Sequence, residues 1–108
     1  MNDTLQVLYD VVKSRKETKQ EGSYTCYLFE KGLDKILKRC GEECSEMIIA
    51  SKNESQEELV GESCDLLYHM TVLMVERDVP LDAVMSVLDK RSQKIGNLKK
   101  FHVVDRES

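Results

Sequence analysis

The sequence contains no tryptophan, only two phenylalanines and a single proline. With so few large aromatic side chains, the core of the folded chain must be mainly aliphatic. No stretch approaches the roughly 20 consecutive apolar residues of a membrane-spanning helix, which argues against a membrane protein. Residues 1–4 also lack the basic start and apolar run of a signal peptide. We therefore expect a cytoplasmic protein.

Basic residues are outnumbered as well. The chain has 16 basic and 20 acidic side chains and a formal net charge of −4, so nucleic acid is not an expected partner. Its 108 residues suffice for one domain. A lone domain of this size buries only about two-thirds of its unfolded surface, so we expect it to gain stability by pairing with a second chain.

The four cysteines lack the C-x-x-C spacing of a zinc or redox motif. Cys40 and Cys44 lie on the apolar side of their predicted helix, which favours small buried hydrophobic residues in a reducing compartment. A zinc site formed by Cys40, Cys44, Cys64 and His69 is one alternative, and a disulfide framework is another.

Helical periodicity and end signals divide the chain into successive helices, with no strand pattern. The expected helices span residues 4–18, 24–31, 33–52, 55–77 and 81–91. Capping or terminating residues accompany these spans, namely Ser23, Gly32, Asn53, Ser55 with Glu58, Pro80 and Gly96-Asn97. The pattern predicts an all-α protein, a small bundle of four to five helices.

The apolar positions predict which faces are buried. Segment 66–75 is apolar on almost every side, so it should lie at the centre of a bundle or under a dimer interface. Tyr27 and Tyr68 are expected in the core or in the wall of a pocket. The other residues expected to point inward are Leu33, Ile36, Leu37, Cys40, Cys44, Met47, Ile48, Val84, Val87 and Leu88.

Two acidic pairs occur on consecutive predicted helices. Glu43 and Glu46 are three residues apart, as are Glu62 and Asp65, so each pair shares one helical face. If the two helices pack antiparallel, the four carboxylates converge, which is costly unless a cation lies between them. Four oxygen ligands favour a hard ion, Mg²⁺ or alternatively Mn²⁺. The pattern predicts a metal site that handles phosphates.

The alternative to a metal site is an ordinary solvated face or a set of salt bridges. Asp65 directly precedes the apolar segment 66–75, and His69 follows one turn later. Ionisable groups at such a place are costly unless paired or metal-bound, which favours a site. His69 is either a hydrogen-bonded core histidine or a residue that hydrogen-bonds Asp65 and orients it toward a metal ion.

Three basic residues precede the acidic cluster on the same stripe: Lys35, Lys38 and Arg39. They either hold phosphate oxygens or pair along the helix, as Lys38 with Glu42 and Arg39 with Glu43.

The order of the acidic motifs resembles that of the MazG-like all-α nucleotide pyrophosphohydrolases. It reads Glu42-Glu43-x-x-Glu46 and then Glu62-x-x-Asp65. The sequence around these acidic motifs is similar to that of the phosphoribosyl-ATP pyrophosphatase family of histidine biosynthesis. The matching stretches are Ser23-Tyr24-Thr25-x-x-Leu28-Phe29-x-x-Gly32-x-x-Lys35-Ile36, Gly41-Glu42-Glu43, Ala50-x-Lys52-Asn53, Glu57-Glu58-Leu59 and Asp65-Leu66-Leu67-Tyr68-His69. The resemblance covers roughly residues 4–91. We assign 1–91 to this domain and leave 92–108 as an unassigned tail.

The resemblance implies hydrolysis of 1-(5-phosphoribosyl)-ATP to 1-(5-phosphoribosyl)-AMP and pyrophosphate by a homodimer. Water activated by Mg²⁺ would attack the α–β phosphoanhydride, and no covalent nucleophile is required. The alternatives are a house-cleaning nucleoside triphosphate pyrophosphatase and a non-enzymatic helical dimerisation module.

The resemblance also assigns roles to residues. The expected metal ligands are Glu43, Glu46, Glu62 and Asp65, and the expected catalytic residues are Glu42, Glu43 and Glu46, with Glu42 orienting or deprotonating the water. Candidates for the substrate phosphates are Lys35, Lys38, Arg39 and Lys52. Ser23, Tyr24 and Thr25 are expected to close over the substrate as a loop.

Overall fold

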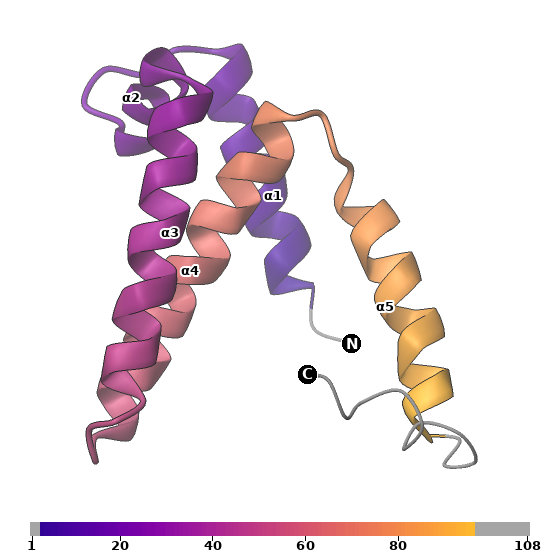
Figure 1. Cartoon of the computed structure of the whole chain (residues 1–108). Coiled ribbons are helices and arrows are strands. Elements are labelled where there is room, and N and C mark those ends of the chain that lie inside the picture. Colours follow the sequence, from indigo (N-terminus) through magenta and orange to yellow (C-terminus); the bar gives the residue numbers. More distant parts are fainter. Residues whose placement is uncertain (1–2, 97–108) are drawn as a thin grey trace.

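The computed structural model describes residues 3–96, which form five α-helices and no strand (Figure 1). The helices are α1 (Thr4–Glu17), α2 (Tyr24–Lys31), α3 (Leu33–Ala50), α4 (Gln56–Glu76) and α5 (Leu81–Gly96). The all-α prediction is confirmed. Helix α3 ends at Ala50 rather than Lys52, and α5 continues beyond Arg91 to Gly96. No described helix is both long and apolar enough to cross a membrane.

Helices α3 and α4 form a long hairpin whose two arms run in opposite directions (Figure 1). Helix α1 packs on α4, and the short α2 contacts both α1 and α3. Helix α5 makes no extensive contact with any of the other four and stands apart from them in Figure 1. The hairpin is therefore the element that carries the two acidic motifs side by side.

The helix ends follow from local hydrogen bonds. Ser23 Oγ accepts from the Cys26 backbone N–H at 3.1 Å and caps α2. Gly32, with φ of 94°, ends α2 and leads directly into α3. At the start of α4, Ser55 Oγ accepts from the Glu58 N–H at 3.3 Å. The carboxylate of Glu58 accepts from the side chain of Asn53. Only the serine half of the expected capping box is thus formed.

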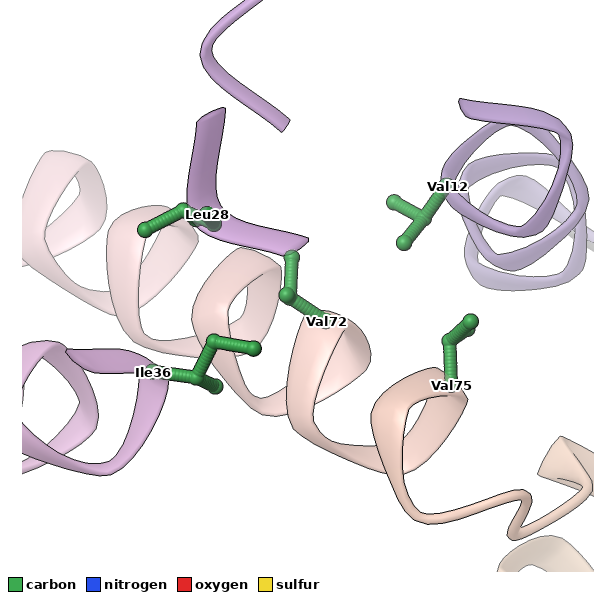
Figure 2. Packing of buried hydrophobic residues seen from close by; sticks show 5 residues of the cluster. All are labelled: Val12, Leu28, Ile36, Val72 and Val75. Carbon is green, nitrogen blue, oxygen red and sulfur yellow. The ribbon is translucent and has the colours of Figure 1, made fainter. Parts of the chain in front are cut away.

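The core is small and aliphatic, as the composition predicts. Its fully or almost fully buried members come from α1, α2, α3 and α4 and converge in Figure 2: Val12, Leu28, Ile36, Val72 and Val75. Val72 and Val75 of α4 lie between the contributions of the other helices, so burying this cluster holds α4 at the centre of the structure.

Many apolar residues expected to point inward are exposed in the single chain. Leu37 and Ile48 of α3 are 46% and 58% exposed, and Leu67 of α4 is 47% exposed. Also exposed are Cys44, Cys64, Met70, Val87 and Leu88. For Leu37, Cys44, Ile48, Val87 and Leu88 the burial prediction is wrong within one chain, because α4 covers only one side of α3 and no described helix covers α5. The exposure of Leu67 and Met70 is compatible with the dimer-interface alternative for segment 66–75. The apolar pattern of segment 66–75 therefore serves two surfaces, one packed in the core and one open.

Candidate active site

Three carboxylates from the α3–α4 hairpin meet at one point. Carboxylate oxygens of Glu43, Glu62 and Asp65 all lie within 4.8 Å of one another. Glu43 is buried, with 3% of its surface exposed, whereas Glu62 is half-buried and Asp65 is exposed. The structure thus brings together three of the four expected metal ligands. Glu46 is exposed at the edge of this group, near enough to Glu62 to act on its titration.

The cluster is electrostatically strained without a cation. Burial raises the pKa of Glu43, and the carboxylates of Glu46 and Asp65 act in the same direction. Burial also raises the pKa of Glu62, again with help from the neighbouring carboxylates. Oε1 of Glu43 and Oε1 of Glu62 are buried and have no hydrogen-bond partner among the described residues. A hard divalent cation would satisfy both oxygens and remove the repulsion, so the donor set fits Mg²⁺.

Arg39 is the counter-ion of this cluster. Its guanidinium donates to Glu42 Oε1 at 2.5 Å and to Glu43 Oε2, and its Nε donates to the Tyr24 hydroxyl at 3.1 Å. The hydrogen bond from Arg39 lowers the pKa of Glu42, and the charge of Arg39 opposes the rise in the pKa of Glu43. Of the two roles considered for Arg39, the structure therefore displays pairing along the helix, which extends to Glu42 as well as Glu43.

His69 connects α4 to the start of α2. It is buried, and its Nδ1 lies 2.8 Å from the main-chain oxygen of Asp65. A carbonyl oxygen can only accept, so Nδ1 donates to it, and in the tautomer with Nε2 unprotonated that nitrogen accepts from the Tyr24 hydroxyl, 3.2 Å away. His69 thus bonds the backbone of Asp65, not its carboxylate, and behaves as a hydrogen-bonded core histidine. Nothing in the sequence spacing indicates the link to Tyr24.

The segment expected to close over the substrate is helical. Ser23 is the cap of α2, and Tyr24 and Thr25 form its first turn. The Thr25 hydroxyl is hydrogen-bonded to the hydroxyl of Tyr68 on α4, which anchors that turn. Residues 23–25 are therefore the cap and first turn of a helix rather than a loop, and their contact with the substrate stays a prediction.

The lysines expected to bind phosphate differ in their position relative to the acidic residues of α3. Lys35 and Lys38 of α3 lie near enough to Glu42 for their charges to lower its pKa. Lys52 lies in the turn after α3, nine residues beyond Glu43. The helix has ended at Ala50, so Lys52 is not on the helical stripe that carries Lys35 and Lys38. Lys52 is therefore the least well placed of the candidates.

The zinc alternative is not formed. All four cysteines are free thiols, and the Cys40 thiol donates to the main-chain oxygen of His69 at 3.4 Å. Within residues 3–96, the three carboxylates are the only group of potential metal ligands that converge.

A hollow of about 780 Å³ lies at the turn between α1 and α2. Its walls comprise residues 19–24 together with Cys26, Tyr27 and Glu30. Tyr24 lines this hollow and also bonds Arg39 and His69, so it links the hollow to the acidic cluster through Arg39.

Comparison with known proteins gives a consistent result. A family model described as phosphoribosyl-ATP pyrophosphohydrolase matches residues 5–92. The phosphoribosyl-ATP pyrophosphatase of Clostridium botulinum (strain Kyoto / Type A2) is 56% identical over 98 residues, which cover 91% of this chain and 89% of that protein. The phosphoribosyl-ATP pyrophosphatase of Clostridium novyi is 53% identical over 97 residues, or 90% and 88% of the two chains. A histidine biosynthesis bifunctional protein, HisIE, of Caldanaerobacter subterraneus is 51% identical over 92 residues, which are 85% of this chain and 45% of that protein.

Proposed function

This chain belongs to the phosphoribosyl-ATP pyrophosphohydrolase family, and from that premise we propose how its own residues perform the reaction. The reaction is hydrolysis of phosphoribosyl-ATP to phosphoribosyl-AMP and pyrophosphate, in histidine biosynthesis. The observation that carries the proposal is the convergence of Glu43, Glu62 and Asp65, with two buried carboxylate oxygens that have no protein partner in the described chain.

We propose that these three residues hold Mg²⁺, with Glu46 at the edge of the group as a further ligand. The orphaned oxygens of Glu43 and Glu62 support this assignment, because burial of an unpaired carboxylate is otherwise only a cost. When bound, the ion supplies charge neutralisation for the triphosphate and lowers the pKa of a bound water. The rigid hairpin keeps the carboxylates together before substrate arrives, so little reorganisation is required at the moment of reaction.

Glu42 orients the attacking water rather than acting as a strong base. Its hydrogen bond to Arg39 lowers its pKa, and a carboxylate of lowered pKa is a weak proton acceptor. It remains ionised and can accept a hydrogen bond from the water. Arg39 holds Glu42 and Glu43 in one orientation, and Lys35 and Lys38 on the same helix provide positive charge for phosphate oxygens.

The active form is a homodimer in this proposal. Exposed apolar residues form a stripe on each arm of the hairpin: Leu37, Cys44 and Ile48 on α3, and Val60, Cys64 and Leu67 on α4. Helix α5 also exposes Val87 and Leu88 and is not packed on the rest of its own chain. Contiguous apolar surface of this kind is typical of an interface with another chain, and a second copy supplies matching stripes.

The test is a Mg²⁺-dependent assay of phosphoribosyl-ATP hydrolysis with the wild type and Asp65→Asn. We expect pyrophosphate release from the wild type and a loss of orders of magnitude in the variant. A second readout is thermal unfolding, in which millimolar Mg²⁺ with pyrophosphate should raise the melting temperature of the wild type only. Turnover of ordinary nucleoside triphosphates in place of phosphoribosyl-ATP, or no thermal shift in the wild type, would contradict the proposal.

A further inference from the structure

The hollow at the α1–α2 turn has aromatic and acidic walls. Tyr24 and Tyr27 are 44% and 39% exposed, and their rings lie 6.0 Å apart between centroids at an interplanar angle of 25°. Glu21 and Glu30 line the same hollow. Exposed tyrosine rings beside carboxylates are the usual components of sites that bind organic cations.

Two cationic side chains of the chain already use these walls. Lys19 Nζ lies 2.7 Å from Glu30 Oε2, and Lys31 Nζ lies 5.8 Å from the centroid of the Tyr27 ring. Both interactions are at the surface, where such contacts are weak and easily exchanged. The walls therefore favour positive charge, and a ligand can displace the lysines at little cost.

The hollow is connected to the carboxylate cluster through Tyr24. In phosphoribosyl-ATP the reacting α-phosphorus is separated from the purine only by a ribose. Tyr24 belongs both to the wall of the hollow and to the hydrogen-bond network that reaches Glu43 through Arg39. This connection is the reason to seat the purine of a substrate held at the cluster on the Tyr24 and Tyr27 rings.

The purine of this substrate differs in charge from that of ATP. Attachment of the phosphoribosyl group at N1 of adenine makes the amino-substituted ring strongly basic, so that near neutral pH it carries a delocalised positive charge. The adenine of ATP is neutral under the same conditions. A site that prefers a cationic ring therefore separates the two nucleotides without any contact to the second ribose.

We propose that this hollow binds the cationic adenine of phosphoribosyl-ATP, with its ring on Tyr27 and Tyr24 and its charge facing Glu30, and that it thereby discriminates against ATP. The inference deepens the proposed function and rests on it for the identity of the substrate. Tyr27 and Glu30 are specificity residues in this account, since neither contacts the carboxylate cluster in the structure.

The first experiment measures binding without catalysis. 1-Methyladenosine 5′-monophosphate carries the cationic ring, and AMP is its neutral counterpart. Calorimetric titration of the full chain should show the methylated nucleotide binding about 3- to 30-fold more tightly, the range of a cation–π contact. Tyr27→Leu and Glu30→Gln should each reduce this preference, whereas Tyr27→Phe, which keeps the ring, should retain it. Glu54→Gln, an equal charge change between α3 and α4, is the matched control.

The second experiment compares the kinetics of phosphoribosyl-ATP hydrolysis. Tyr27→Leu should raise KM by a similar factor and leave kcat within about twofold, because the contact is made equally in ground and transition states. Equal binding of the two nucleotides by the wild type, no binding of either, or an unchanged preference in both Tyr27→Leu and Glu30→Gln would overturn the inference. A wild type that shows the binding preference but does not hydrolyse phosphoribosyl-ATP would instead overturn the proposed function.

Discussion

Tyr24 of α2 and His69 of α4, 45 residues apart in sequence, are joined by a hydrogen bond from the tyrosine hydroxyl to Nε2 at 3.2 Å. The same hydroxyl accepts from Arg39 Nε at 3.1 Å, so one oxygen ties α2 to both arms of the hairpin. The ring of Tyr24 also faces the hollow proposed for the purine. One hydroxyl therefore links the hollow proposed for the purine to the arms that carry the proposed metal site.

We predict that Tyr24→Phe destabilises the protein, because it removes the hydroxyl that bonds Arg39 and His69 but keeps the aromatic ring. Loss of the hydroxyl leaves the buried His69 Nε2 without its donor, which should cost about 1–3 kcal/mol of unfolding free energy. Urea unfolding followed by circular dichroism measures this change. Tyr27→Phe is the control, because the Tyr27 hydroxyl is not part of the network. Equal stability of the two variants would show that the bond to His69 contributes nothing.

We predict that Glu62→Gln stabilises the metal-free protein while it weakens metal binding. Glu62 carries a raised pKa because of its burial and its carboxylate neighbours, so removal of its charge relieves both effects. Mg²⁺ affinity should fall on the order of tenfold or more with one carboxylate fewer. Thermal melts with and without Mg²⁺ measure the two effects, and Glu54→Gln serves as the control. A variant that melts lower than the wild type in the absence of metal would contradict the predicted repulsion.

The difference in stability between the wild type and Glu62→Gln should depend on pH. A carboxyl group whose pKa is raised by folding binds more protons in the folded state, so its contribution to stability falls as pH rises above the unfolded value of about 4.5. The advantage of the variant should therefore be present at pH 7 and shrink as pH falls toward 4.5. Urea midpoints of both proteins across this range, without metal, provide the measurement. If the greater stability of Glu62→Gln did not change with pH, it could not come from the titration of the Glu62 carboxyl group.

We predict that Leu67→Asp converts the proposed dimer to monomers. Leu67 is 47% exposed in the single chain and lies on the apolar stripe of α4. A carboxylate there should be tolerated by the isolated fold but disfavoured in an apolar interface. Light scattering coupled to size-exclusion chromatography measures the mass. Val7→Asp, at an exposed apolar position of α1 outside the proposed stripes, is the control because it makes the same charge change. A wild type that is monomeric at micromolar concentration would contradict the dimer itself.

Much of the fold can be predicted from short stretches of the sequence. The caps at Ser23 and Ser55 and the break at Gly32 act within one or two turns, so their effect does not depend on the rest of the chain. The meeting of Glu43 with Glu62 and Asp65 also follows from local spacing if the two consecutive helices form an antiparallel hairpin.

The exposure of Leu37, Ile48 and Leu67 could not be predicted from helical spacing. An apolar side chain has the same spacing whether a helix of its own chain or another molecule covers it. Burial depends on what the tertiary arrangement places against each face, and here α4 covers only one side of α3.

The sequence alone determined the helices, the caps at Ser23 and Ser55 and the kind of chemistry, because propensity, capping and carboxylate spacing are local properties. Only the tertiary structure decided the partners of Arg39 and His69. Arg39 bonds Tyr24 as well as its acidic neighbours, and His69 bonds the same hydroxyl instead of the Asp65 carboxylate. These contacts join residues far apart in the chain, and their geometry exists only after α2 has docked on the hairpin.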